Sequence, residues 1–239
     1  MKKPVIGIIP VYNLTNDAND PYLDNATFVN MYYDLITKNG GIPIGLLDYN
    51  NIDDYINMCD GYLWPGGGCI IRYYNRIFDD AINNNKPILG ICLGMQAIAT
   101  YFNVLDDMKI TNLSYEDTYQ KNKNDQPYLY RLDEQAVMNH NHYVTKDEAA
   151  IKAALHDVLI KENTELYKIY QTKQISVPSM HTIAVSRIPS HLKVTANTQD
   201  GVIEGMEHID PNVKILGVQF HPELIQDEKL FKWLIDNAN

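Results

Sequence analysis

A cysteine stands where two sequence patterns meet. Residues 87–91 form an apolar run that ends directly before Cys92, and the next apolar positions recur at helical spacing, namely Met95, Ile98, Ala99 and Phe102. This pattern predicts a strand, a sharp turn and a helix, with Cys92 at the corner. The helix N-terminus would favour the thiolate, and the N–H of Leu93 could face a developing oxyanion. We interpret Cys92 as a candidate nucleophile; the alternative is a packed cysteine at a strand end.

A histidine and a carboxylate follow another apolar run. Residues 214–220 lead directly into His221, Pro222 and Glu223. Residues two apart in an extended chain point the same way, and proline favours an extended residue before it. Glu223 could therefore hold one ring nitrogen of His221 while the other faces a nucleophile, as in a general base with its orienting carboxylate. In isolation such a tripeptide is more often a polar surface turn, but its place at a strand end favours the catalytic interpretation.

A glycine-rich turn follows a third predicted strand, at 61–64. Pro65 is followed there by three glycines, and no phosphate-binding or dinucleotide-binding pattern comes after them. A backbone N–H of Gly67 or Gly68 could complete an oxyanion hole with Leu93; the alternative is a flexible turn. The turn, the cysteine and the histidine all fall at the carboxyl ends of strands, where open α/β sheets form their sites.

Strands and helices alternate along most of the chain. Strands are predicted at 5–9, 42–47, 61–64, 87–91 and 214–220, and helices at 25–38, 48–58, 73–83, 92–103 and 226–237. This alternation predicts an α/β fold with a mostly parallel sheet and helices on both faces. Short strands at 175–177, 182–185, 193–196 and 202–206 predict a small antiparallel extension. We expect 1–239 to form one domain, with 108–127 as a polar loop and 149–159 as either a helix or short strands.

Composition narrows the functional class. The chain has 239 residues, a net charge of −10 and no basic cluster longer than two residues, so we expect neither nucleic acid nor an anionic membrane as a partner. The cysteines are Cys59, Cys69 and Cys92, an odd number without a C-x-x-C pair. A reducing, cytoplasmic location therefore fits better than a disulfide framework. No stretch is long and apolar enough to span a membrane.

Two further groups of residues could take part in chemistry. His140 and His142 could bind a metal, but no third ligand is evident nearby in the sequence, and a polar loop is the preferred interpretation. Cys69 could be a second reactive thiol, although a packed cysteine is the more common case. The sequence predicts no metal site and no cofactor.

The three chemical segments resemble one known superfamily. Residues 65–68, 90–96 and 217–223 are similar to the motifs of the class I glutamine amidotransferases. Segments 4–8, 40–43 and 179–185 most resemble the γ-glutamyl-γ-aminobutyrate hydrolase branch, peptidase family C26. The resemblance covers nearly the whole chain and is weakest at 104–170. It implies a flavodoxin-like fold of the glutamine amidotransferase type.

The resemblance also implies a reaction. Cys92 would attack the carbonyl of a γ-glutamyl amide, such as γ-glutamyl-γ-aminobutyrate, while His221 deprotonates the thiol and then protonates the leaving amine. Glu223 would orient His221, and water would hydrolyse the glutamyl thioester. The substrate would be a small molecule and no cofactor would be required.

The same resemblance suggests residues for substrate binding. Gln96 matches a position that lines the glutamyl pocket in relatives, and Ser179 and His181 fall where this branch places substrate-side residues. The alternatives are a helix-surface glutamine and a polar turn at a strand entry. The chain departs from the branch at 69–74 and at Ile183, so the catalytic motifs are intact while the recognition motifs are altered.

Two rival functions stay open. One is a glutaminase subunit that delivers ammonia to a synthetase partner. The other is a non-catalytic binding module on the same fold, against which the complete set of Cys92, His221 and Glu223 argues. A homodimer is one option for assembly.

Overall fold

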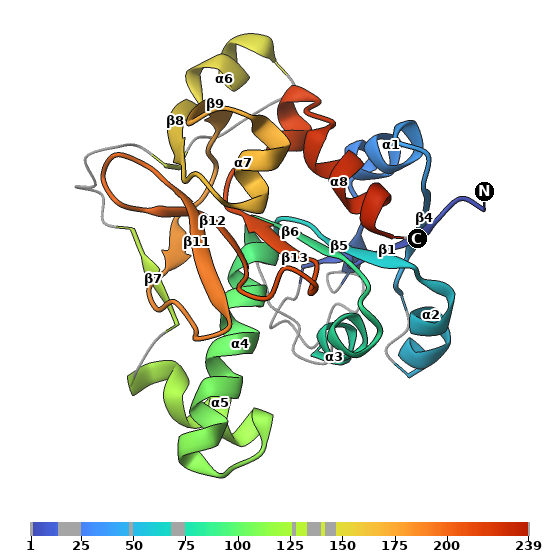
Figure 1. Cartoon of the computed structure of the whole chain (residues 1–239), viewed down its shortest axis with the longest axis vertical. Coiled ribbons are helices and arrows are strands. Elements are labelled where there is room, and N and C mark those ends of the chain that lie inside the picture. Colours follow the sequence, from blue (N-terminus) through green and yellow to red (C-terminus); the bar gives the residue numbers. More distant parts are fainter. Residues whose placement is uncertain are drawn as a thin grey trace.

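A nine-stranded sheet forms the centre of the protein. The computed structural model describes residues 2–13, 25–47, 50–67, 75–125, 128–132, 140–141 and 147–238. The strand order is β4-β1-β5-β6-β13-β12-β11-β8-β9, and helices cover the sheet (Figure 1). The predicted α/β fold, with a mostly parallel sheet, helices and an antiparallel extension, is confirmed.

The parallel half of the sheet contains five strands. In spatial order they are β4 (Ile42–Gly45), β1 (Val5–Ile8), β5 (Gly61–Trp64), β6 (Ile88–Ile91) and β13 (Ile215–Val218). Every residue of β5, β6 and β13 is buried, as expected for strands covered on both faces. Trp64 pairs with Gly90, and Gly90 pairs with Gly217. The carboxyl ends of these three strands therefore lie side by side.

The antiparallel half continues the same sheet. It consists of β12 (Ile203–His208), β11 (Leu192–Asn197), β8 (Leu155–Ile160) and β9 (Gln174–Pro178). Side chains along β8 alternate between exposed and buried, which places His156 on the covered face. Two small antiparallel pairs lie outside the main sheet: β2 (Val11–Asn13) with β3 (Asn25–Thr27), and β7 (Leu129–Arg131) with β10 (Ile183–Val185).

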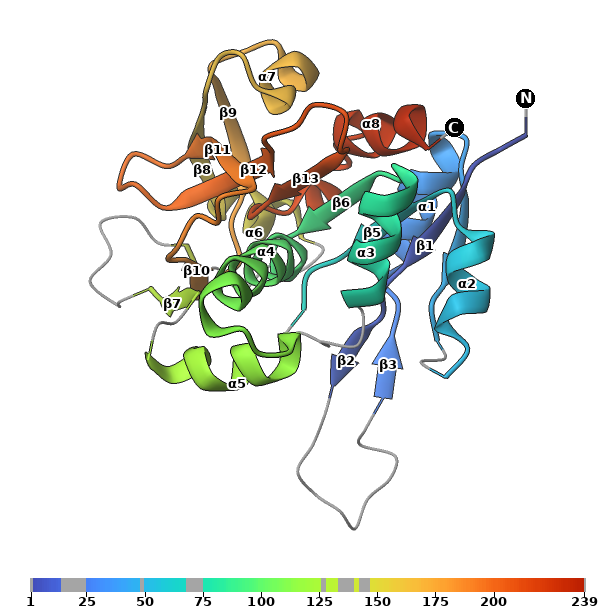
Figure 2. The same cartoon turned by 60° about the horizontal axis from the view of Figure 1, so that its bottom comes forward.

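Helices pack on both faces of the sheet, as Figure 2 shows. One face carries α1 (Asn30–Lys38), α7 (Glu165–Tyr170) and α8 (Lys229–Asn237), and the other carries α2 (Ile52–Met58), α3 (Asn75–Asn84) and α4 (Leu93–Thr111). The buried apolar side chains accordingly divide into two clusters, one on each face. None of the described helices combines the length and the apolar composition that crossing a bilayer requires.

Two predictions that concern helices need correction, and a third helix was not predicted. The first helix begins at Asn30 rather than near residue 25, because Asn25–Thr27 pair with β2 instead. The predicted loop at 108–127 is largely helical: α4 continues to Thr111, and α5 (Tyr115–Asp125) follows. The polar sequence of α5 concealed it, but Ser114 Oγ accepts the N–H of Asp117 in its first turn and the helix packs on α4. The short helix α7 was not predicted at all.

Both alternatives for 149–159 occur in succession. The segment begins in α6 (Glu148–Ala153) and continues as β8. The closing helix is preceded by a 3₁₀ turn, η2 (Pro222–Ile225), which contains the glutamate predicted to act in the site. The strand at 214–220 is shorter than predicted, with β13 ending at Val218.

Candidate active site

Cys92 occupies the corner between β6 and α4. The strand ends at Ile91 and the helix begins at Leu93, so Cys92 is the residue that turns the chain. Its backbone has φ 52° and ψ −104°, a conformation that costs a residue with a side chain about 1–3 kcal/mol. The N–H of Cys92 donates to Val218 O at 2.8 Å, so the neighbouring strand β13 holds the strained corner in place.

Two glycines allow this corner to form. A Cβ on Gly94 would overlap the carbonyl oxygen of Trp64, so only glycine lets α4 pack directly against the end of β5. A Cβ on Gly66 would lie 2.8 Å from His221 Cε1 and 3.4 Å from Cys92 Cβ. The backbone of the glycine-rich turn therefore borders both the thiol and the imidazole.

His221 and Glu223 form a buried pair. His221 Nδ1 donates to Glu223 Oε1 at 2.7 Å, and both side chains are at most 5% exposed. The N–H of His221 donates to Pro178 O at 3.1 Å, which ties this segment to β9. The predicted contact is present, although Glu223 lies in a 3₁₀ turn rather than in extended chain. His221 Nε2 has no hydrogen-bond partner in the described part of the chain.

Tyr32 is a third member of this network that sequence reasoning missed. Its hydroxyl donates to Glu223 Oε1 at 2.9 Å from helix α1, and the ring is 3% exposed. Burial and the Glu223 carboxylate raise the pKa of Tyr32 well above its ordinary value, so the hydroxyl keeps its proton. The sequence indicates only that Tyr32 is buried, because position 32 falls on the same helical face as Leu35 and Ile36; it gives no indication of the contact with Glu223.

The electrostatics favour an imidazolium at His221. Burial alone would lower the pKa of His221, but the Glu223 carboxylate and the Cys92 sulfur oppose it more strongly. The pKa of His221 is therefore raised well above its ordinary value. A protonated imidazole beside a cysteine can stabilise a thiolate and later donate a proton to a leaving group.

A pocket of about 370 Å³ opens onto these groups. Cys92, His221 and Glu223 line it together with Gly66 and Gly67. The remaining described lining is mostly apolar and consists of Val11, Val29, Met31, Tyr32, Met180 and Leu224. This volume falls in the usual range for small-molecule sites.

The predicted oxyanion groups are only partly described. Gly67 borders the pocket, and Leu93 is the first residue of α4, where backbone N–H groups have no intrahelical acceptor. Gly68 lies outside the described residues, and so do Cys69 and His142. Their predicted roles stay predictions.

The three predicted substrate-binding residues are not among those that line the pocket. Gln96 is buried and donates through Nε2 to Ile183 O at 2.9 Å. Ser179 Oγ donates to His140 O at 2.8 Å, and His181 Nε2 faces Glu204 Oε1 at 3.3 Å. Met180, between the last two, does line the pocket. Substrate contact by Gln96, Ser179 and His181 stays a prediction, while the structure engages all three with other polar groups.

The fold is that of a class I glutamine amidotransferase. The glutaminase domain of Trypanosoma brucei CTPS, solved with bound acivicin, matches 99% of this chain and 94% of its own with a TM-score of 0.65 at 18% identity. Residues 72–223 match the model of the Peptidase C26 family, and the chain belongs to that family.

Curated relatives extend this similarity. A putative glutamine amidotransferase-like protein of Rickettsia prowazekii, RP404, is 27% identical, with 98% of this chain and 97% of the relative covered. The CTP synthase of Staphylococcus haemolyticus is 28% identical over 98% of this chain, which spans only 44% of that relative.

Proposed function

We propose that the protein hydrolyses a γ-glutamyl amide bond by nucleophilic catalysis at Cys92. The observation that carries this proposal is the arrangement around His221. Its Nδ1 is held by Glu223 at 2.7 Å, while its Nε2 has no partner among the described residues and the ring lines the same pocket as the cysteine. A base that is fixed on one side and available on the other is what an activated thiol requires.

The reaction divides into two steps. The Cys92 thiolate attacks the amide carbonyl, and the N–H of Leu93 stabilises the developing oxyanion. His221 gives its Nε2 proton to the nitrogen as the C–N bond breaks, which leaves a glutamyl thioester and a free amine. His221 then takes a proton from a water molecule that attacks the thioester, and glutamate and the Cys92 thiolate are released.

The character of the pocket lining bears on the leaving amine. The described pocket lining is apolar apart from the reacting groups and Tyr32, which supports an amine with an aliphatic portion. A γ-glutamyl amine such as γ-glutamyl-γ-aminobutyrate is therefore the proposed substrate class. A thiol nucleophile also suits a reducing compartment such as the cytoplasm.

A glutaminase subunit is the second candidate. It is supported by the similarity of nearly the whole chain to part of a CTP synthase and to a glutaminase domain. In that case the leaving group is ammonia, and a synthetase partner receives it.

The test is product release from a panel that contains glutamine, γ-glutamyl-γ-aminobutyrate, γ-glutamyl alkylamines and γ-glutamyl peptides. Wild type is compared with Cys92→Ala and with Cys59→Ala, a matched control at a buried thiol outside the pocket. Selective amine release that is lost only in Cys92→Ala supports the hydrolase.

Two other outcomes discriminate between the candidates. Turnover of glutamine alone, or covalent labelling of Cys92 by acivicin without turnover, favours the glutaminase subunit. No turnover and no labelling overturn both catalytic proposals and leave the binding module.

A further inference from the structure

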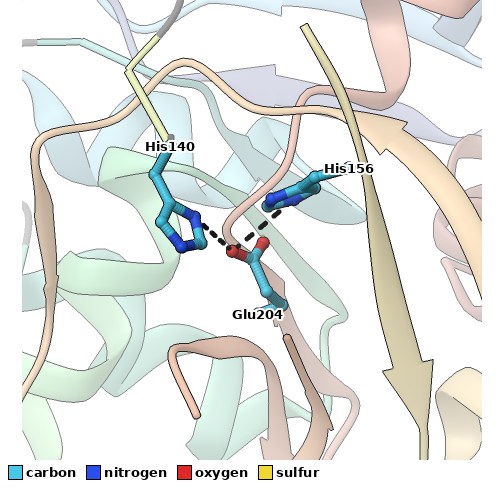
Figure 3. Close-up of side chains that lie close together, drawn as sticks. All are labelled: His140, His156 and Glu204. Carbon is cyan, nitrogen blue, oxygen red and sulfur yellow. Dashed lines mark ion pairs between the residues drawn. The ribbon is translucent and has the colours of Figure 1, made fainter. Parts of the chain in front are cut away.

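Three histidines surround one buried glutamate outside the pocket described above. His156 lies on β8 and Glu204 on β12, while His140 and His181 lie in connecting segments, and none of the four residues is more than 6% exposed. Figure 3 shows His140 and His156 approaching the Glu204 carboxylate from two sides. We call these four residues the His₃Glu cluster. The four positions are distant in sequence, and the fold alone brings them together.

The contacts within the cluster are too long for strong hydrogen bonds. Glu204 Oε1 lies 3.5 Å from His140 Nδ1, 3.7 Å from His156 Nε2 and 3.3 Å from His181 Nε2. Charge-assisted hydrogen bonds between nitrogen and a carboxylate oxygen are about 2.7–2.9 Å long. One oxygen is therefore faced by three nitrogens, each farther away than such a bond requires.

The opposite sides of two rings are already engaged. His140 Nε2 lies 3.1 Å from Asp200 Oδ2, and His181 Nδ1 lies 3.1 Å from the carbonyl oxygen of Ile183. Both acceptors require a proton on those nitrogens. In the neutral rings, the nitrogens that face Glu204 are then unprotonated and carry lone pairs. Lone pairs that converge on a carboxylate repel it unless a proton or a metal ion lies between them.

Other polar atoms of the cluster also lack hydrogen-bond partners among the described residues. Both ring nitrogens of His156 and the Oε2 atom of Glu204 are buried without a hydrogen-bond partner in the described part of the chain. Leaving such groups unsatisfied in the interior is expensive, and native structures seldom do so without a bound ion or water.

Three of the four residues lie close enough together to share one metal ion. Zinc binds imidazole nitrogen and carboxylate oxygen at about 2.0–2.2 Å, so two of its ligands lie about 3.3–3.6 Å apart. Ligating atoms of His140, His156 and Glu204 lie within 4.8 Å of one another, and the His140 ring centroid is 5.1 Å from that of His156 and 5.0 Å from that of His181. Histidine nitrogen with one carboxylate is a donor set that suits zinc.

We propose that the His₃Glu cluster binds one Zn²⁺ ion through His140, His156 and Glu204, while His181 Nε2 stays 3.3 Å from Glu204 Oε1. Asp200 is the outer partner that fixes the tautomer of His140, as the second shell of a metal site does. Three protein ligands leave the fourth position of a tetrahedral ion to a water molecule, and none of the three residues lines the pocket described above. This site departs from the sequence expectation of no metal, because the local pair of His140 and His142 gave no indication of His156 or Glu204.

The site would brace one wall of the catalytic pocket. His181 directly follows Met180, which lines the pocket, and Pro178 O accepts the backbone N–H of His221. The N–H of His181 and the hydroxyl of Ser179 both bind His140 O, at 2.9 Å and 2.8 Å. A metal ion shared by β8, β12 and the segment that contains His140 would therefore fix Ser179 and His181 through these two hydrogen bonds.

The test is the zinc content of the full chain. Protein stripped with a chelator is loaded with Zn²⁺, desalted and measured by mass spectrometry of the metal. About one zinc per chain is expected in wild type, and at least a tenfold lower content in both His156→Asn and Glu204→Gln. His191→Asn is the matched control, at a partly exposed histidine outside the cluster.

A second control excludes the active-site thiol. Because Cys92, His221 and Glu223 could also hold zinc, Cys92→Ala must keep its metal for the assignment to stand. Absence of zinc from loaded wild type, its retention in His156→Asn or Glu204→Gln, or its loss in Cys92→Ala overturns the proposal.

Cobalt gives a readout that does not depend on variant folding. Wild type loaded with Co²⁺ is expected to show the intense visible bands of a tetrahedral nitrogen and oxygen site, and added Zn²⁺ is expected to remove them. Weak bands of an octahedral ion, or no bands, would contradict the proposed geometry.

Discussion

Two clusters in this protein place histidine against a buried carboxylate, and they differ in the length of their contacts. His221 Nδ1 meets Glu223 Oε1 at 2.7 Å, while three imidazole nitrogens stand 3.3–3.7 Å from Glu204 Oε1. The short contact has room for a proton and the long ones have room for a metal ion. The same two side-chain types therefore form a hydrogen-bonded pair at the first separation and the proposed metal site at the second.

The location of the two clusters follows the same division. His221 and Glu223 line a pocket, where a ring nitrogen can reach a substrate. His140, His156 and Glu204 are buried, and they do not appear among the residues that line that pocket. A small molecule in the pocket could reach the first cluster, whereas the second cluster is enclosed by the protein.

The largest effect is expected from removing the imidazole of the first cluster. His221→Asn should reduce turnover of the best γ-glutamyl substrate by about 10⁴-fold or more, because thiol activation and leaving-group protonation are both lost. Zinc content should equal that of wild type. Steady-state kinetics and metal analysis of the same preparation check both statements. A loss of zinc in this variant would contradict the assignment of the metal to the His₃Glu cluster.

The reciprocal substitution acts on stability. Glu204→Gln leaves three histidines around a neutral amide and, in the zinc-loaded protein, removes a ligand. We expect the free energy of unfolding of the zinc-loaded protein to fall by about 3–5 kcal/mol, because the buried ion loses its charged partner. Denaturant unfolding with and without Zn²⁺ measures the change. If the variant's unfolding curve in the presence of Zn²⁺ coincided with that of wild type, the result would contradict metal binding by Glu204.

Tyr32→Phe tests the pair of His221 and Glu223 without removing either residue. The variant removes the 2.9 Å hydrogen bond to Glu223 Oε1 and keeps the ring. A hydrogen bond to a charged group contributes about 1.5–3 kcal/mol, so kcat should fall about tenfold or more while KM stays near its wild-type value.

Tyr33→Phe is the matched control for that variant, since Tyr33 is the adjacent tyrosine and packs edge-on against Phe28. A purely structural role for Tyr32 would lower the melting temperature and leave the pH profile of kcat unchanged. A positioning role shifts the profile, because Tyr32 shares the oxygen that holds His221.

The smallest effect is a pH dependence of stability. The pKa of His221 is raised in the folded protein, mainly by Glu223 and Cys92 acting against burial. Its contribution is therefore complete below the unfolded-state pKa of about 6.5 and declines as the pH rises toward the folded-state value. The melting temperature of Glu223→Gln should lie further below that of wild type at pH 6 than at pH 9. An equal difference at both pH values would argue against the pair.

Sequence patterns predicted the elements whose residues are neighbours in the chain. The strand, turn and helix around Cys92 depend on one apolar run followed by helical spacing, and the contact between His221 and Glu223 spans two residues. Such features are local, so the sequence carries them directly. The polar helix α5 escaped because tertiary packing on α4, rather than an apolar stripe, stabilises it.

Residues that meet across the fold could not be found in this way. Tyr32 reaches Glu223 from a separation of 191 residues, and His181 meets Glu204 from 23 residues away on different segments. Nothing local in spacing or residue type distinguishes a histidine such as His156, on an alternating strand, from an ordinary buried one. The residues of the His₃Glu cluster come together only through the arrangement of the antiparallel half of the sheet.

The place of β13 in the sheet also sets the point in synthesis at which the corner at Cys92 can be completed. This strand pairs with β6, so the N–H of Cys92 can donate to Val218 O only after residues 215–218 exist. Until those residues are made, a growing chain carries Cys92 without His221 and with one edge of β6 unpaired. That edge is open to mispairing until β13 covers it.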